Sequence, residues 1–193
     1  MRIIAGEYRG RRLEAPRGQG TRPTTDRVRE SLMSVIHSAR GGFDGAVVLD
    51  AFAGSGALSL EALSRGAVSA VLCERDREAA SVIERNVRAL GLGRDEARLV
   101  RGDVLRRPPM PASGKPFDLV FLDPPYALAA AEVFALLARL SDAGALAVDA
   151  IVSYEHDGAD DAAVRVLAAG AGWSIASHRR FGDTAIDILE RSA

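Results

Sequence analysis

The chain has 193 residues, of which 48% are hydrophobic and 26% charged, and its formal net charge is −1. This length suits one α/β domain with a small appendage, and no apolar run approaches the roughly 20 residues that cross a bilayer. The N-terminus lacks the apolar core of a signal peptide, and Cys73 is the single cysteine, which excludes an internal disulfide. We therefore expect a cytoplasmic protein without membrane contact and without a metal site.

Charge is distributed unevenly along the chain. Residues 1–40 contain nine arginines and four acidic residues, a net charge of +5, so the remaining residues carry −6 in total. We interpret residues 1–40 as a basic N-terminal extension and residues 41–193 as the main domain. A basic extension on an acidic body is suited to the phosphate backbone of a nucleic acid. The alternative is a solvated arginine-rich surface, since Lys115 is the only lysine of the chain.

The extension is expected to form a hairpin, a loop and a helix. Residues 2–14 alternate loosely between apolar and polar, as in a β-hairpin, and residues 16–23 predict a loop. Thr24 or Thr25 then caps a helix, which Gly41-Gly42 ends. The apolar face of this helix has the spacing i, i+4, i+7 and i+8, and it consists of Val28, Leu32, Val35 and Ile36.

From residue 46 onward, strands alternate with helices. This pattern predicts an α/β fold with a mostly parallel seven-stranded sheet, helices on both faces and an antiparallel C-terminal hairpin. The acidic stretch 157–161 is expected to be a surface loop. The predicted strands are 46–50, 69–74, 97–101, 117–123, 145–154, 173–180 and 184–189, and the predicted helices are 57–65, 77–90 and 129–140.

Acidic residues stand at the ends of the first four predicted strands. In open α/β sheets, ligands bind outside the carboxyl ends of the strands. The glycine-rich turn 51–56 follows the first of these residues, but it has no lysine for a Walker loop, and Ser59 departs from the dinucleotide fingerprint. Singly, each acid is a loop residue or a helix cap. Together they predict one pocket for an adenosine-containing ligand, formed by Asp50, Glu74, Asp103 and Asp123.

The sequence Asp123-Pro124-Pro125-Tyr126 follows the fourth strand. Two prolines fix the backbone, so the carbonyl of Pro124 can point outward. That carbonyl and the carboxylate of Asp123 together would accept both protons of a planar amine, while Tyr126 offers a ring for stacking. The alternative interpretation is a stiff turn in which Asp123 is a local acceptor.

These motifs, in this order, resemble those of class I methyltransferases that use S-adenosylmethionine. Residues 22–32 and 60–67 further resemble the bacterial 16S ribosomal RNA (guanine-N2)-methyltransferase D family, and the resemblance extends from about Arg2 to Leu189. It implies a Rossmann-like fold and methyl transfer to the N2 of a guanine in 16S ribosomal RNA. The implied partner is this RNA in an assembled or assembling small subunit, and we expect a monomer.

The resemblance also implies roles for particular residues. The catalytic set is Asp123, Pro124 and Tyr126, and Pro125 joins Tyr126 as a substrate contact. The implied cofactor contacts are Asp50, Phe52, Gly54, Ser55, Gly56, Glu74, Arg75, Asp103, Val104 and Asp123. Candidates for contact with RNA phosphates, or for ordering a lid over the pocket, are Arg9, Arg11, Arg12, Arg22, Arg27 and Arg29.

Two other functions remain open from the sequence. The amine motif would also suit a methyltransferase acting on adenine N6 of DNA, although no separate DNA-recognition domain is evident. A non-catalytic RNA-binding assembly factor could keep the same fold. Cys73 is interpreted as a core residue, and Glu155, at the end of the fifth strand, is given no catalytic role.

Overall fold

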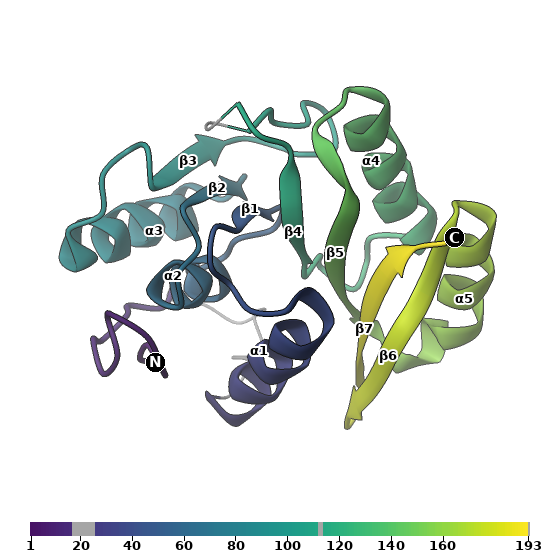
Figure 1. The fold of residues 1–193 in the computed structure, drawn as a ribbon, viewed down its shortest axis with the longest axis horizontal. Helices are drawn as coiled ribbons and strands as arrows, with labels where there is room; N and C mark the ends of the chain where they lie inside the picture. Colours follow the sequence, from purple (N-terminus) through teal and green to yellow (C-terminus); the bar gives the residue numbers. More distant parts are fainter. Residues whose placement is uncertain (17–25, 112–113, 193) are drawn as a thin grey trace.

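The computed structural model describes residues 1–16, 26–111 and 114–192 (Figure 1). In chain order the described elements are α1 (Asp26–Arg40), β1 (Val47–Asp50), α2 (Ala57–Ser64), β2 (Ser69–Glu74), α3 (Arg77–Leu90), β3 (Ala97–Arg101), β4 (Phe117–Leu122), α4 (Ala130–Asp142), β5 (Leu146–Asp157), the single 3-10 turn η1 (Gly158–Asp160), α5 (Asp161–Gly170), β6 (Trp173–Phe181) and β7 (Thr184–Arg191). After the first helix, strands alternate with helices, except that β4 follows β3 and β7 follows β6 without a described helix between them.

The seven strands form one sheet in the order β3-β2-β1-β4-β5-β7-β6. Strands β1 to β5 pair in parallel, and β7 pairs antiparallel with β5 and β6. From β1 the chain builds outward to β3, and it then returns to the other side of β1 with β4. The sheet therefore has a topological switch point between β1 and β4, where open α/β sheets bind their ligands.

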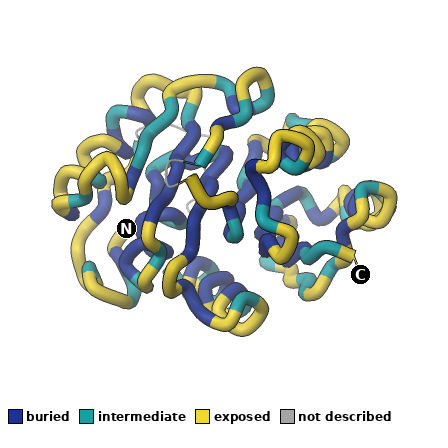
Figure 2. The backbone as a smooth tube through the Cα atoms, turned by 45° about the horizontal axis from the view of Figure 1, so that its top comes forward, coloured by how far each residue is buried: buried dark blue, intermediate teal, exposed yellow. Residues whose placement is uncertain are grey.

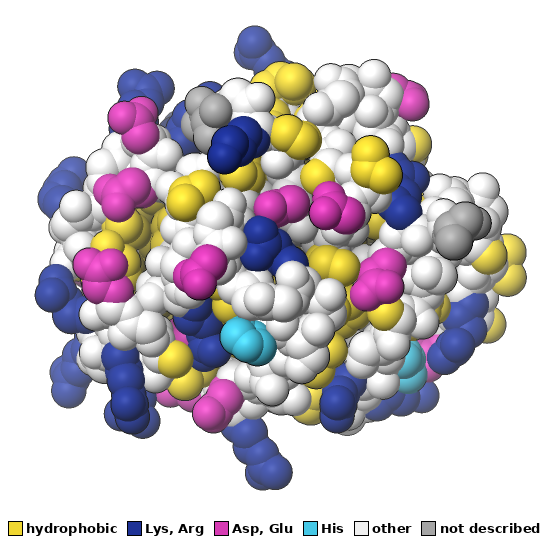
Figure 3. Space-filling model, in the orientation of Figure 1, with side chains coloured by type: hydrophobic (Ala, Val, Ile, Leu, Met, Phe, Trp, Pro, Cys, Tyr) yellow, Lys and Arg dark blue, Asp and Glu magenta, His cyan; other side chains and the backbone are white. Residues whose placement is uncertain are grey.

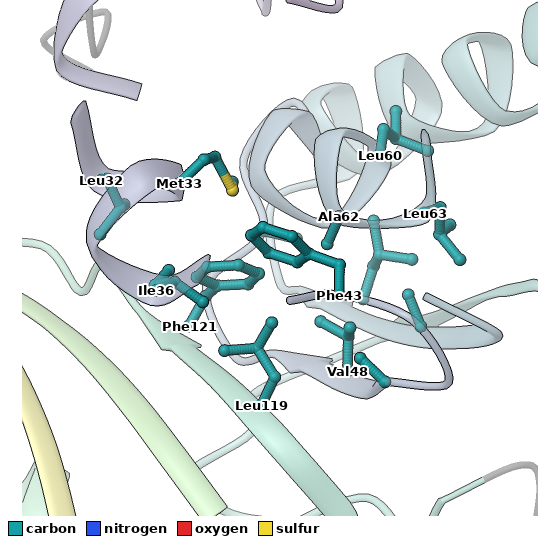
Figure 4. Packing of buried hydrophobic residues seen from close by; sticks show 14 of the residues in the cluster. Leu32, Met33, Ile36, Phe43, Val48, Leu60, Ala62, Leu63, Leu119 and Phe121 are labelled. Atoms are coloured by element: carbon teal, nitrogen blue, oxygen red, sulfur yellow. The ribbon is translucent and has the colours of Figure 1, made fainter. Parts of the chain in front are cut away.

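The sheet is buried on both faces because the strand residues alternate between two cores (Figures 1 and 2). Val48 and Phe121 belong to the core that also holds residues of α1, α2 and α3, whereas Leu49 and Leu122 belong to the core that holds residues of α4 and α5. Figure 4 shows Met33 of α1 in the first core near the strand residues. The predicted Rossmann-like fold is confirmed.

The N-terminal segment, residues 1–16, packs against this sheet core. Its predicted hairpin is reduced to an isolated bridge between Arg2 and Arg12, supported by a hydrogen bond from the Ile3 amide to the Arg11 carbonyl at 2.9 Å. Ile3 and Leu13 are only 1% and 5% exposed, and both belong to the core under α1. The segment is therefore held by tertiary packing rather than by a strand ladder. The threonines expected to cap α1 lie outside the described residues.

The region from residue 157 to residue 170 differs from the prediction. The expected surface loop at 157–161 is the end of β5, the turn η1 and the first residue of α5. The Asp157 side chain accepts the Ala159 amide at 2.9 Å, and Val164 and Ala168 are buried against the sheet. Alanines dominate α5, so its apolar stripe is weak in the sequence. Among the described helices, none is long and apolar enough to cross a membrane.

Candidate active site

Three carboxylates lie in a row across neighbouring strand ends at the switch point. Asp50 of β1 stands opposite Leu72 of β2 and Phe121 of β4 in the parallel register. Glu74 and Asp123 each lie two residues beyond these partners, so all three side chains point to the same face of the sheet. Asp50 is the deepest, at 1% exposure, and the other two are half-buried. Parallel strands about 4.8 Å apart therefore bring these predicted site residues together.

The glycine-rich turn joins β1 to α2 directly beside this row. Gly54 and Gly56 have positive φ angles of 55° and 78°, which disfavour any other residue. A Cβ on Gly54 would enter open space, whereas one on Gly56 would lie 2.9 Å from Leu72 Cδ2. The Glu74 carboxylate accepts the Gly54 amide at 2.8 Å and so fixes the turn. The turn thus presents bare backbone to the space above the strand ends.

The surroundings of Asp50 change the pKa of its carboxyl group. It accepts a hydrogen bond from Ser59 Oγ at 2.8 Å, which favours the charged form. Burial outweighs this contact and raises the pKa of Asp50 to about 7, with a further contribution from the negative charges of Asp123 and Glu74. A cation placed among these three carboxylates would relieve their repulsion. No group of acidic, histidine and cysteine side chains among the described residues is arranged to hold a metal ion.

The two prolines and the tyrosine that follow β4 lie next to Asp123. Pro124 is buried, whereas Pro125 and Tyr126 are exposed, and Tyr126 is 45% exposed. The Tyr126 hydroxyl lies 2.5 Å from Thr184 Oγ1 of β7, which orients the ring. The Pro125 carbonyl accepts the Leu128 amide, but no described residue donates to the Pro124 carbonyl. We call this carbonyl and the Asp123 carboxylate the amine clamp.

Glu155 lies beside the amine clamp, a proximity that the sequence did not predict. Leu122 pairs with Tyr154 in the register of β4 and β5, so Asp123 and Glu155 are the next neighbours along the two strands. Burial raises the pKa of both carboxyl groups, and the charge of Asp123 raises the pKa of Glu155 further. Its position at a parallel strand end was visible in the sequence. Its proximity to Asp123 could not be predicted, because the order of strands in a sheet depends on the tertiary structure.

The other predicted cofactor contacts differ in burial and in hydrogen bonding. The Asp103 carboxylate accepts the Leu105 amide at 2.9 Å in the turn after β3 and remains half-buried. The Ser55 carbonyl accepts the Asn86 side-chain amide at 3.0 Å, which ties the turn to α3. Arg75 is exposed, and Phe52 is half-buried against the core under α4. Val104 is 3% exposed and belongs to the same core.

The predicted RNA-contacting arginines divide into two groups. Arg9, Arg11, Arg12 and Arg27 are exposed, and basic side chains gather over the N-terminal region at the lower left of Figure 3. Arg22 lies outside the described residues.

Arg29 corrects the prediction of an RNA contact. It is 1% exposed, donates to Asp26 Oδ1 at 2.9 Å and to the Arg2 carbonyl at 2.5 Å, and lies 3.8 Å from Glu61. Its contacts join α1 to the N-terminal segment and to α2, and the alternative role of ordering a lid over the pocket stays a prediction.

Comparisons with known proteins agree with this architecture. The family model described as Conserved hypothetical protein 95 matches residues 1–190. Ribosomal RNA small subunit methyltransferase D of Escherichia coli K12 is 37% identical over 193 residues, which cover 100% of this chain and 91% of that protein. The chain belongs to the small-subunit ribosomal RNA methyltransferase D family.

Two solved structures of similar sequence share the fold along their whole length. The structure of the Escherichia coli protein yhhF is 36% identical, with a TM-score of 0.80, and the match covers 100% of this chain and 98% of that one. A hypothetical protein of Thermus thermophilus is 31% identical, with a TM-score of 0.73, over 98% of this chain and 99% of that one. The fold described above is therefore shared with both solved structures.

Proposed function

We propose that this protein transfers a methyl group from S-adenosylmethionine to the exocyclic N2 of a guanine in 16S ribosomal RNA. Membership of a family that includes a named small-subunit ribosomal RNA methyltransferase supports methylation of ribosomal RNA. One observation carries the choice of an amine as acceptor. The amine clamp of Asp123 and Pro124 lies at the switch point, one strand from Asp50 and next to an oriented, exposed Tyr126.

The residues at the sheet edge fit S-adenosylmethionine. The open space at Gly54 would admit a ligand against bare backbone, and Asp50, Glu74 and Asp123 together favour a cationic group there. In this proposal, Asp50 and the turn hold the methionine end, Glu74 holds the ribose hydroxyls and Asp103 accepts from the adenine amine. When bound, the cofactor supplies an electrophilic methyl group on a positively charged sulfur.

The protein's own contribution is to prepare a poor nucleophile. The lone pair of the guanine amine is delocalised into the ring. Acceptance of both N–H groups by Asp123 and the Pro124 carbonyl favours a pyramidal nitrogen and stabilises the positive charge that develops on it. Tyr126 stacks on the extruded base, which is worth about 1–3 kcal/mol. The methylated nitrogen then loses its proton to Asp123 or to water.

A Glu74→Gln variant should separate cofactor binding from amine activation. Glu74 fixes the Gly54 amide and, in this proposal, the ribose, and charge-assisted hydrogen bonds are worth about 1.5–3 kcal/mol. We expect calorimetry to give a dissociation constant for S-adenosylmethionine that is about 10–100-fold higher. At saturating cofactor, kcat should fall less than tenfold. Unchanged affinity would contradict the role of Glu74.

Exchange of exposed arginines should test the RNA contact. We expect the double variant Arg9→Gln/Arg12→Gln to weaken RNA binding, and its log Kd against log salt slope should decrease by about 0.7–0.9 for each lost phosphate contact. Substitutions are cleaner than a deletion, because the same segment contributes Ile3 and Leu13 to the core. Arg165→Gln, an exposed position on α5, is the matched control. An equal slope in all three proteins would exclude contact through Arg9 and Arg12.

The decisive test is methyl transfer to small ribosomal subunits from a strain that lacks this gene. Tritium from labelled S-adenosylmethionine should enter the 16S RNA, and digestion should give N2-methylguanosine as the labelled nucleoside. Labelled N6-methyladenine in DNA would instead support a DNA methyltransferase. Binding to subunits without any transfer would support an assembly factor.

A further inference from the structure

The position of Glu155 links it to the base rather than to the cofactor. Leu122 and Tyr154 are register partners, and both side chains belong to the core under α4 and α5. The next residues, Asp123 and Glu155, therefore point to the opposite face, where Ile186, the β7 partner of Glu155, joins the core under α1. Glu155 extends the row of carboxylates by one strand, on the side of Asp123 away from Asp50.

The two neighbouring carboxylates are poorly compensated: the charge of His156 lowers the pKa of Glu155, but burial and the charge of Asp123 outweigh it. Both are half-buried, and no hydrogen bond or ion pair joins either side chain to another residue in the described part of the chain. A partly buried acid without a donor is costly, and two such acids side by side are more costly still. The raised pKa values of both groups reflect this. Two such carboxylates are suited to bind a ligand that has several hydrogen-bond donors.

The amine clamp alone does not distinguish between bases. Guanine, adenine and cytosine all carry an exocyclic amine, but they differ in the ring nitrogen that lies beside it on the Watson–Crick edge. In guanine this nitrogen is N1–H, a donor, whereas in adenine it is N1 and in cytosine N3, both acceptors. Enzymes that extrude a base recognise it by hydrogen bonds to this edge. A carboxylate next to the clamp therefore matches guanine and opposes the other two bases.

We propose that Glu155 accepts the N1–H of the target guanine and so determines which base the amine clamp activates. This inference rests on the proposed function and assigns the base specificity of the same site to a residue outside the Asp123–Tyr126 motif. Asp123 and Pro124 bind the two N2 protons, and Glu155 binds the third donor of the edge. Adenine would leave the Glu155 carboxylate facing a lone pair, which a site built for a donor rejects strongly.

The test compares guanine with 2-aminopurine at the methylated nucleotide. 2-Aminopurine carries the same amine but has an acceptor at N1. Small subunits are reconstituted with 16S RNA ligated to carry either base, and kcat/KM is measured above pH about 8, where Glu155 is ionised. We expect wild-type protein to prefer guanine. In Glu155→Gln the guanine:2-aminopurine ratio should fall about 10–100-fold, since an amide can donate to N1.

The two bases differ in intrinsic reactivity, but this difference cancels when the guanine:2-aminopurine ratio of kcat/KM is compared between wild-type protein and the variant. Asp149→Asn, an exposed position on the same strand, is the control and should leave the ratio unchanged. The fluorescence of 2-aminopurine rises when the base is extruded, so it reports without turnover whether each variant still takes the base into the pocket. If Glu155→Gln keeps the wild-type ratio, Glu155 does not contact N1 and the inference is wrong. If wild-type protein forms no N2-methylguanosine, the proposed function fails instead.

Discussion

Replacement of Asp123 by alanine is expected to lower kcat by at least about 10²–10³-fold while the affinity for S-adenosylmethionine stays within about tenfold. In the proposed mechanism, the Asp123 carboxylate accepts one proton of the amine, and its negative charge stabilises the positive charge that develops on the nitrogen. Cofactor affinity should change little because Asp50, Glu74 and the glycine turn remain. The measurements are single-turnover methyl transfer to small subunits and calorimetric titration with the cofactor.

Asp123→Asn is the matched variant, since it keeps the volume and one acceptor oxygen but removes the charge. It should retain more activity than Asp123→Ala. Full activity in Asp123→Ala would overturn the mechanism. A loss of cofactor binding as large as the loss of kcat would show that Asp123 holds the cofactor rather than the amine.

The same carboxylate predicts a pH dependence. Burial raises the pKa of Asp123 to about 6, and that of its neighbour Glu155 is raised to about 8. Protonation removes the negative charge that the amine requires, so kcat/KM should decline as the pH falls from about 8 to below about 6. Asp50 shares this edge and has a raised pKa as well, so the decline should span more than one ionisation. A flat profile over this range would contradict the role of these groups.

The fold was accessible from the sequence because its strands are continuous apolar runs. Strands buried on both faces, such as 117–122, stand out without any knowledge of their neighbours, and glycines mark most helix ends. Helix α5 was missed because alanines give it little amphipathic contrast. The residues Asp50, Glu74 and Asp123 could be placed together because parallel strands end at one edge of a sheet.

The relations that the sequence did not disclose depend on which elements become neighbours. Glu155 lies beside Asp123 only because β4 and β5 are neighbours in the sheet. Arg29 is buried because it contacts Glu61, which lies 32 residues away on α2. A surface arginine and a buried one are identical in composition. Counting charges therefore overestimated the basic surface of the N-terminal extension and did not indicate how the extension is held.

Glu61 holds the N-terminal segment together with Ser64 and Asn86, and the loss of Glu61 is expected to produce the largest decrease in stability. Its side chain is 0% exposed, and it accepts the backbone amides of Ile4 at 2.8 Å and Ala5 at 3.0 Å. Arg65 donates to it at 2.7 Å, and Arg29 lies 3.8 Å away. Glu61→Ala would leave two partly buried amides without acceptors and Arg29 with Asp26 as its remaining counter-charge.

We expect Glu61→Ala to lower the free energy of unfolding by about 3–5 kcal/mol, because two backbone amides and two arginines lose the buried carboxylate that they share. For a chain of this size, that corresponds to a decrease in Tm of about 6–20 °C. Calorimetry measures the decrease, and limited proteolysis should show cleavage within residues 1–16 well below Tm. Glu84→Ala, at an exposed ion pair with Arg101 on the surface of α3, is the control and should cost less than about 1 kcal/mol.

A second variant distinguishes the charge from the backbone contacts. Glu61→Gln keeps an acceptor for one amide but cannot neutralise Arg29 and Arg65, so it should remain destabilised relative to the wild type. Addition of Arg29→Met should recover part of that loss, because the buried cation that has lost one of its two counter-charges is then removed as well. If Arg29→Met instead adds its full cost to that of Glu61→Gln, the two residues are not coupled, and the backbone amides alone explain how Glu61 holds the segment. Recovery would show that the ion pair also contributes to anchoring the N-terminal segment.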